Sequence, residues 1–131
     1  MKDFIQYHNS DKIGFPASKL DEPKMFTRKS VRNLSSSRVW LISGEGKSNK
    51  EFYLAAVFKV NRTTSGTFDH PDFANSAYGI GHVIGEKIKL NGIPWFEDLK
   101  ANLNNFKNGL TELTDDNIVK ELELASAGYA I

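Results

Sequence analysis

The fold is decided by the longest strand-like run of the chain, Phe52-Tyr53-Leu54-Ala55-Ala56-Val57-Phe58-Lys59-Val60. Residues 54–58 are almost continuously apolar, and aromatic and β-branched side chains flank the two alanines. A run of this kind predicts a strand that is buried on both faces, or one at the centre of a closed sheet.

Three further strands are predicted around this run. Residues 3–7 and 38–43 are short runs rich in aromatic and β-branched types, and residues 82–90 alternate between apolar and polar side chains. The polar segment 44–50 predicts a hairpin connection. The glycines and the proline of residues 63–81 predict a long loop.

The spacing of apolar residues changes after Pro94 from strand-like to helical. Phe96, Leu99, Leu103 and Phe106 are three or four residues apart, which predicts a helix that Asn108-Gly109 ends. A last helix is predicted to open with Thr114 as N-cap and to end at Gly128, and residues 24–34 are compatible with a further short helix. Residues 1–131 are therefore expected to form one α+β domain, a small curved or closed, mainly antiparallel sheet with C-terminal helices.

Composition limits the classes of function. The 131 residues are 40% hydrophobic and 25% charged, which is typical of a soluble globular protein, and none is cysteine. Disulfides, thiolate catalysis and cysteine-zinc sites are thus excluded, and we expect a cytoplasmic protein. No apolar run approaches the roughly 20 residues of a membrane span, and the N-terminus does not resemble a secretory signal.

Neither a metal nor a cofactor is predicted. The three histidines are widely separated, and the Asp69-His70-Pro71-Asp72 stretch is also an ordinary loop sequence. The Gly46-Lys47-Ser48 stretch resembles the end of a phosphate-binding P-loop, but Leu41 stands where that loop needs a glycine.

A polar cluster follows the first predicted strand directly. It offers nearly every kind of hydrogen-bonding side chain in six successive positions, Tyr7, His8, Asn9, Ser10, Asp11 and Lys12. A cluster of this kind at the end of a rigid strand can bind a flat polar ligand. The same residues also fit a capped turn, because Asn, Ser and Asp favour turns for local backbone reasons.

A basic stretch between residues 24 and 38 contains no acidic residue. Its cations are Lys24, Arg28, Lys29, Arg32 and Arg38, with several serines beside them. Cations next to small hydroxyls suit phosphate oxygens, which predicts a phosphate-binding surface. The alternative is a solvated surface loop.

Large aromatic residues lie on or beside the predicted strands. Trp40 and Trp95 are the preferred candidates for a ligand pocket, because tryptophan is rarely buried completely and its N–H needs a partner. Two such rings could sandwich a planar base, and the alternative is a plain aromatic core.

The order of these features resembles the PUA-like superfamily of small β-barrels, which includes the EVE, YTH, ASCH and SRA domains. The Tyr7–Asp11 turn occupies a place similar to the pocket-lining turn of EVE-type domains, and the Trp40–Ser43 run resembles another pocket-lining strand. The nearest likeness is to EVE-like modules that precede nuclease domains in modification-dependent restriction enzymes.

This resemblance implies a module that binds nucleic acid, DNA in preference to RNA, and captures a flipped, modified base such as 5-methylcytosine, 5-hydroxymethylcytosine or N6-methyladenine. It implies that Asn9 or Asp11 reads the base edge and that Trp40 or Trp95 forms a wall of the cage. Ser43 would line the pocket, the basic stretch would bind the flanking phosphates, and a nuclease domain or subunit would be the partner.

Two other classes of function remain open on the sequence. A small nuclease or other enzyme could use His8, Asp11 and Lys12 as acid-base and phosphate-binding groups. A protein-interaction module could dock a partner through the acidic C-terminal helices, where acidic residues outnumber lysines between Glu97 and Glu123.

Overall fold

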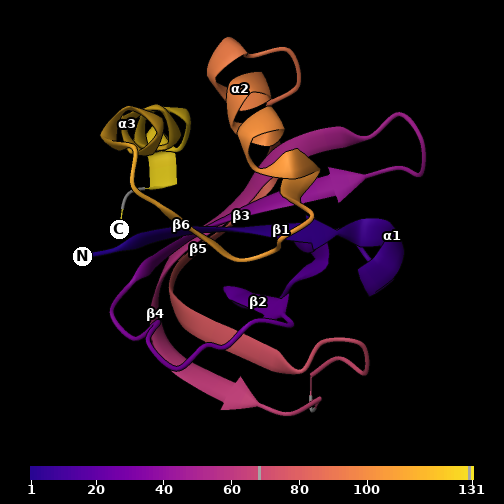
Figure 1. The fold of residues 1–131 in the computed structure, drawn as a ribbon, viewed down its shortest axis with the longest axis vertical. Coiled ribbons are helices and arrows are strands. Elements are labelled where there is room, and N and C mark those ends of the chain that lie inside the picture. Colours follow the sequence, from indigo (N-terminus) through magenta and orange to yellow (C-terminus); the bar gives the residue numbers. More distant parts are fainter. Residues whose placement is uncertain (68, 130) are drawn as a thin grey trace.

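The computed structural model describes residues 1–67, 69–129 and 131 and has the α+β class that the sequence predicts. Figure 1 shows a strongly twisted sheet with helices packed at its side. The strands are β1 (Asp3–Asn9), β2 (Lys24–Thr27), β3 (Arg38–Glu45), β4 (Glu51–Ser65), β5 (Asn75–Lys89) and β6 (Thr111–Leu113). The α-helices are α1 (Ser10–Ile13), α2 (Pro94–Asn102) and α3 (Asp116–Ala125), and the short 3₁₀ turns are η1 (Ala17–Lys19), η2 (Asn104–Phe106) and η3 (Ala127–Tyr129).

The six strands form one mixed sheet in the order β2-β5-β4-β3-β1-β6. Every pairing is antiparallel except that of β1 with β3, so the sheet is mainly antiparallel as predicted. In the part of the chain that the structure describes, β2 and β6 are edge strands that do not pair with each other. The sheet is therefore open, and a closed barrel is not confirmed.

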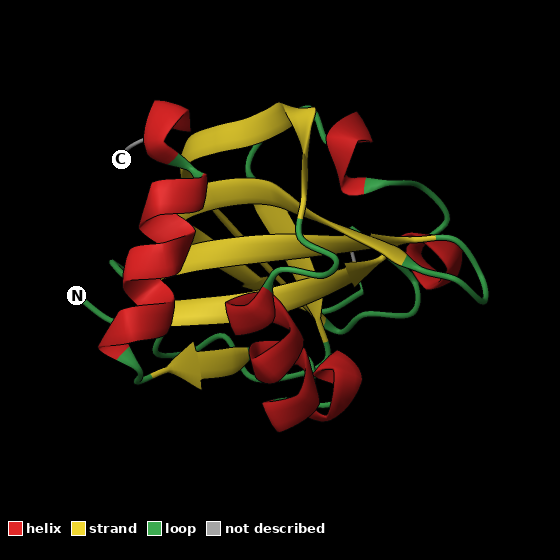
Figure 2. Cartoon of the chain, turned by 90° about the horizontal axis from the view of Figure 1, so that it is seen from above, coloured by secondary structure: helices red, strands yellow, loops and turns green. Residues whose placement is uncertain are grey.

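The run that decides the fold occupies an inner strand. Residues 52–58 of β4 are all buried, with β3 on one side and β5 on the other, which confirms the prediction of a strand buried on both faces. One face carries a cluster around Phe58 and Met25, and the opposite face carries a cluster around Trp40 and Phe96. The helices α2 and α3 lie over the second face (Figure 2).

The predicted loop at 63–81 is shorter than expected, although residue 68 within it lies outside the described residues. Strand β4 continues to Ser65, and β5 begins at Asn75 rather than at residue 82. The misleading signals are Gly79 and Gly81, because a Cβ at either position would overlap the main chain of β4. These glycines permit close approach of two strands, which is the other common reason for glycine in a strand.

The two C-terminal helices that the sequence predicts are present with shifted boundaries, whereas the possible helix at residues 24–34 is absent. Helix α2 begins at Pro94 but ends at Asn102, because residues 104–106 take a left-handed conformation. Helix α3 is capped by Asp115, whose side chain accepts from the Asn117 N–H, rather than by Thr114, and its C-cap is Ser126. Residues 24–27 form a strand instead of the start of a helix because they pair with β5.

Candidate functional site

A cavity of about 820 Å³ lies at the free edge of β1. Strand β6 pairs with β1 only from Asp3 to Ile5, so the edge of β1 is uncovered from Gln6 onward. Gln6 and Tyr7 both line the cavity. Because consecutive residues of a strand point to opposite faces, the cavity wraps around this strand edge.

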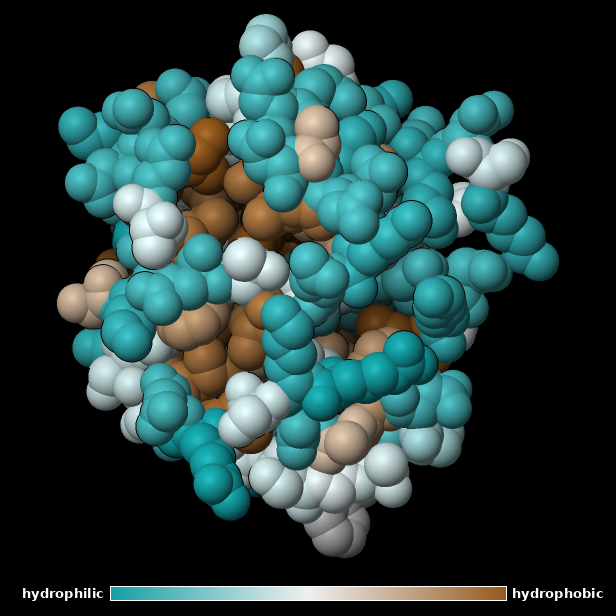
Figure 3. Space-filling model, viewed as in Figure 1, coloured by the Kyte–Doolittle hydropathy of each residue, from teal (hydrophilic) through white to brown (hydrophobic). Residues whose placement is uncertain are grey.

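Segments distant in the sequence close the cavity. They are the end of β2 with the loop after it (residues 27–29), Phe73, the hairpin between β3 and β4 (residues 48–52), Lys100 of α2 and the loop 105–109. Figure 3, drawn in the view of Figure 1, shows brown apolar side chains at the bottom of hollows that teal polar residues surround. The volume is within the 300–1,000 Å³ range of small-molecule sites.

Aromatic rings form one wall of the cavity. Tyr7 stacks on Phe106 with ring centroids 5.4 Å apart, and Phe52 is 5.9 Å from Tyr7. The hydroxyl of Tyr7 is buried without a hydrogen-bond partner among the described residues, and burial raises the pKa of Tyr7 to about 12. Phe73 provides a second aromatic surface elsewhere in the lining.

The loop that carries Phe106 has an unusual backbone. Asn104, Asn105 and Phe106 have φ values of 52°, 54° and 62°, and Gly109 has a φ of 68°. Left-handed conformations are costly for residues other than glycine, most of all for a bulky one such as Phe106. In this conformation the ring of Phe106 stacks on that of Tyr7.

The lining of the cavity is strongly basic. Its cations are Lys12, Arg28, Lys29, Lys50, Lys100 and Lys107, and Glu51 is the acidic residue among the described lining residues. The carboxylate of Glu51 is itself paired with Lys89 at 3.5 Å. The cavity therefore suits an anionic ligand with an aromatic or apolar part.

Contacts with the main chain and with rings position several of these cations. The ammonium of Lys29 donates to the Leu110 carbonyl at 2.9 Å. The guanidinium of Arg28 donates to the Asp72 carbonyl at 3.2 Å and lies 5.1 Å from the Phe73 ring centroid. Lys100 lies 5.0 Å from the Phe52 ring centroid and pairs with Glu97.

The structure brings part of the predicted polar cluster to the cavity. Tyr7, Asn9 and Lys12 line it. Asn9 is also the N-cap of α1, since its side-chain oxygen accepts from the Asp11 and Lys12 N–H groups, so the turn interpretation holds for Asn9 as well. Asp11 is exposed, lies outside the lining and is 4.0 Å from Lys47.

The other members of the cluster lie away from the cavity. His8 is 1% exposed, and its Nε2 donates to the Phe15 carbonyl at 2.8 Å. Burial is the main cause that lowers the pKa of His8. Ser10 and Ser43 lie 3.4 Å apart, hydroxyl to hydroxyl, outside the cavity lining. His8, Asp11 and Lys12 therefore do not converge as the nuclease hypothesis requires.

The two predicted cage tryptophans are not brought to this cavity. Trp40 is 1% exposed, and its indole N–H donates to the Asp3 carboxylate at 3.1 Å. Trp95, in the first turn of α2, packs at the margin of the core cluster, edge-on to Phe96. The rings in the lining are those of Tyr7, Phe52, Phe73 and Phe106.

Of the predicted phosphate-binding residues, some line the cavity and others lie elsewhere. Arg28 and Lys29 line the cavity, whereas Lys24 and Arg32 do not. Arg38 is buried and pairs with Asp3 at 2.5 Å and with Glu123 at 3.2 Å, so carboxylates of the protein itself already neutralise its charge.

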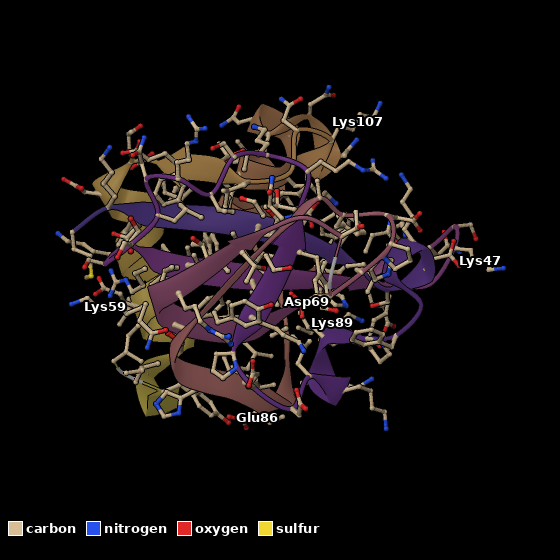
Figure 4. All side chains as sticks on the ribbon, turned by 90° about the horizontal axis from the view of Figure 1, so that it is seen from below. Lys47, Lys59, Asp69, Glu86, Lys89 and Lys107 are labelled. Carbon is tan, nitrogen blue, oxygen red and sulfur yellow. The ribbon has the colours of Figure 1, made fainter. Side chains whose placement is uncertain are left out.

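Sequence reasoning missed Gln6, Lys50, Lys100, Lys107, Phe52, Phe73 and Phe106, which line the cavity from five separate segments. Lys100 and Lys107 share the acidic C-terminal region with Lys120, which does not line the cavity, so no sequence signal distinguished them. Figure 4 shows Lys47 and Lys107 projecting from one half of the molecule, while Lys59 projects from the other.

No group of three His, Asp or Glu side chains that could hold a metal ion occurs among the described residues. His70 serves the fold, because its Nε2 donates to the Ile13 carbonyl and its Nδ1 accepts from the Asp72 N–H. No helix in the described ranges is both long and apolar enough to cross a bilayer.

Comparisons of this chain with protein-family models, with curated proteins and with solved structures gave no match. The cavity is therefore interpreted from its own residues and geometry.

Proposed function

We propose that this chain is a nucleic-acid-binding module that takes one flipped-out base into the cavity at the free edge of β1. The observation that carries the proposal is the combination, in one cavity of about 820 Å³, of four aromatic rings and six cations. A nucleotide has the same two parts, a flat base and a charged backbone.

The balance of energies favours this occupant. Extruding a base from the stack costs a few kcal/mol, and a base stacked on an aromatic side chain recovers about 1–3 kcal/mol. The cations contribute further affinity by releasing counterions from the phosphates, a term that does not depend on sequence.

The resemblance to PUA-like domains supports a more specific form of the proposal. In that form the fold is a PUA-like, EVE-like barrel derivative, and the ligand is a modified base in DNA. The support is the order of the elements and the position of the turn after β1, whose Asn9 and Lys12 line the cavity. A nuclease domain or subunit would then act on the site that this module recognises.

Amide chemical shifts measured during titration with short DNA duplexes test both the activity and its place. Duplexes with one 5-methylcytosine, 5-hydroxymethylcytosine or N6-methyladenine are compared with the unmodified duplex. We expect the amides of Gln6, Tyr7 and Gly109 to shift, and that of Gly85 on β5 to stay unchanged. One modified duplex should bind at least tenfold more tightly than the unmodified one.

Equal affinity for modified and unmodified duplexes, with shifts at the cavity, would reject the modified base and keep nucleic-acid binding. Shifts confined to α3, or no binding at low salt, would reject the proposal as a whole.

A further inference from the structure

Two lysines of the cavity lining are held in place by main-chain carbonyls. The ammonium of Lys29 donates to the Leu110 carbonyl at 2.9 Å, and the ammonium of Lys50 donates to the Gly46 carbonyl at 3.0 Å. Neither lysine pairs with a carboxylate among the described residues. A carbonyl fixes the position of an ammonium without neutralising its charge, so both lysines bring a positioned positive charge to the cavity.

Both ammonium groups keep hydrogen-bonding capacity for a ligand. An ammonium has three N–H donors. Lys29, which is exposed, uses one of them, and Lys50, which is half-buried, uses two because it also lies 3.5 Å from Asn9 Oδ1. At least one N–H of each lysine is therefore available to an anion. Lys100 differs, because it pairs with the carboxylate of Glu97 at 2.9 Å.

The two ammonium groups lie at different levels along β1. Lys29 is held beside Gln6, because its carbonyl partner follows Gly109, where a Cβ would be 3.9 Å from the Gln6 side chain. Lys50 is held beside Asn9, three residues further along the strand. Because a strand rises about 3.3 Å per residue, these two levels are about 10 Å apart. Hydrogen bonds of about 2.8 Å from an ammonium to a phosphate do not join both groups to one phosphate at this separation.

The aromatic wall of the cavity lies between these two levels. Tyr7 is between Gln6 and Asn9 on β1, and its ring stacks on Phe106 and is 5.9 Å from Phe52. A base that stacks on this wall has its own sugar-phosphate backbone running past both ends of it.

We propose that Lys29 and Lys50 bind the two phosphates that flank the captured nucleotide, one on each side. The ligand class is then a nucleotide within a polynucleotide strand, and a nucleotide with one phosphate fills half of the site. This inference rests on the proposed function and adds Lys50 of the β3–β4 hairpin to the phosphate-binding residues.

The test removes the charge of one flanking phosphate at a time. It uses the tightest-binding DNA duplex with one unpaired nucleotide, chosen among adenine, cytosine, 5-methylcytosine, 5-hydroxymethylcytosine and N6-methyladenine. An uncharged methylphosphonate replaces the phosphate on the 5′ side or on the 3′ side of that nucleotide, and affinities are measured by fluorescence anisotropy at one salt concentration. For the wild-type protein we expect each replacement to weaken binding about threefold or more, because each removes one ionic contact.

The variants Lys29→Gln and Lys50→Gln remove the charge and keep an N–H donor for the carbonyl. Each variant should become insensitive to one methylphosphonate, within twofold, and should stay sensitive to the other. The insensitive side should differ between the two variants. Lys59→Gln, which removes an exposed cation outside the cavity, is the control and should stay sensitive to both replacements (Figure 4). Lys→Met replaces Lys→Gln at either position if circular dichroism shows that the variant does not fold.

A wild-type protein that is insensitive to either replacement would overturn the inference. So would folded variants that lose sensitivity on the same side, on both sides or on neither. In all these cases the proposed function survives, because the duplex with its phosphates intact still binds. Failure of the wild-type protein to bind any of the unpaired duplexes would reject the proposed function together with this inference.

Discussion

The hydroxyl of Tyr7 lies against the α-carbon of Gly44, in the space that the Cβ of any other residue would occupy. Gly44 belongs to β3, which pairs in parallel with β1, and the ring of Tyr7 lies across the sheet at this point. The absence of a side chain at Gly44 therefore sets the position of a ring in the cavity wall.

We predict that Gly44→Ala forces Tyr7 to move, lowers the free energy of unfolding by about 1–3 kcal/mol and weakens binding of a flipped base. Gly85→Ala is the matched control, because a Cβ at this exposed strand position would meet no atom within 4 Å. The control should change stability by no more than about 0.5 kcal/mol. Urea unfolding measures both values, and equal stability of the two variants would contradict the assigned role of Gly44.

The second prediction concerns the cations of the cavity. Arg28→Ala with Lys29→Ala should weaken binding about equally for all sequences and should reduce the dependence of affinity on salt, because each lost phosphate contact lowers the logarithmic slope by about 0.7–0.9. Lys59→Ala removes an exposed cation outside the cavity and serves as the control (Figure 4). Titrations at two salt concentrations decide the matter; an unchanged slope in the double variant would mean that these cations do not contact phosphate.

The third prediction separates Arg38 from the ligand-binding cations. Asp3 accepts hydrogen bonds from both the Arg38 guanidinium and the Trp40 indole, so Asp3→Ala leaves the buried indole N–H without its acceptor and removes the more buried of the two carboxylates that pair with Arg38. We expect a loss of about 3 kcal/mol or more in the free energy of unfolding. Glu123→Ala, which removes the more exposed partner of Arg38, should cost less than about 1 kcal/mol. Similar losses in the two variants would show that this network is not buried as described.

The fourth prediction concerns pH. Burial lowers the pKa of His8 below its ordinary value of 6.5, so the unfolded chain binds a proton at a higher pH than the folded protein does. Stability contributed by neutral His8 should be complete above about pH 6.5 and should decrease as the pH falls from there toward the lowered pKa. His8→Gln removes the titrating group, and chemical unfolding between pH 7 and 5 should give a flatter profile for it. An identical profile would exclude this role of His8.

The sequence predicted much of the sheet because β1, β3 and β4 are runs whose composition and burial agree. It misplaced the start of β5, since Gly79 and Gly81 read as loop residues until the close approach to β4 is known. The three-residue strand β6 pairs with a strand more than 100 residues earlier, and no local pattern indicates such a pairing.

The candidate site was less accessible to sequence reasoning. The turn after β1 was identified because its polar residues are consecutive, but the cavity walls come from segments that only the topology brings together. Trp40 was misjudged for a related reason: the partner of its N–H is Asp3, 37 residues away, and not a ligand. A partner that distant cannot be recognised from the spacing of residues.

The most direct test of base capture compares a DNA duplex that contains one unpaired nucleotide with the same duplex fully paired. Extrusion of a base from a pair costs a few kcal/mol, and an unpaired base avoids much of this cost. At a fixed salt concentration we predict that the wild-type protein binds the unpaired duplex at least tenfold more tightly, and that Arg28→Ala with Lys29→Ala weakens both while keeping their ratio. Equal affinity for the two duplexes, or no affinity for either, would contradict base capture.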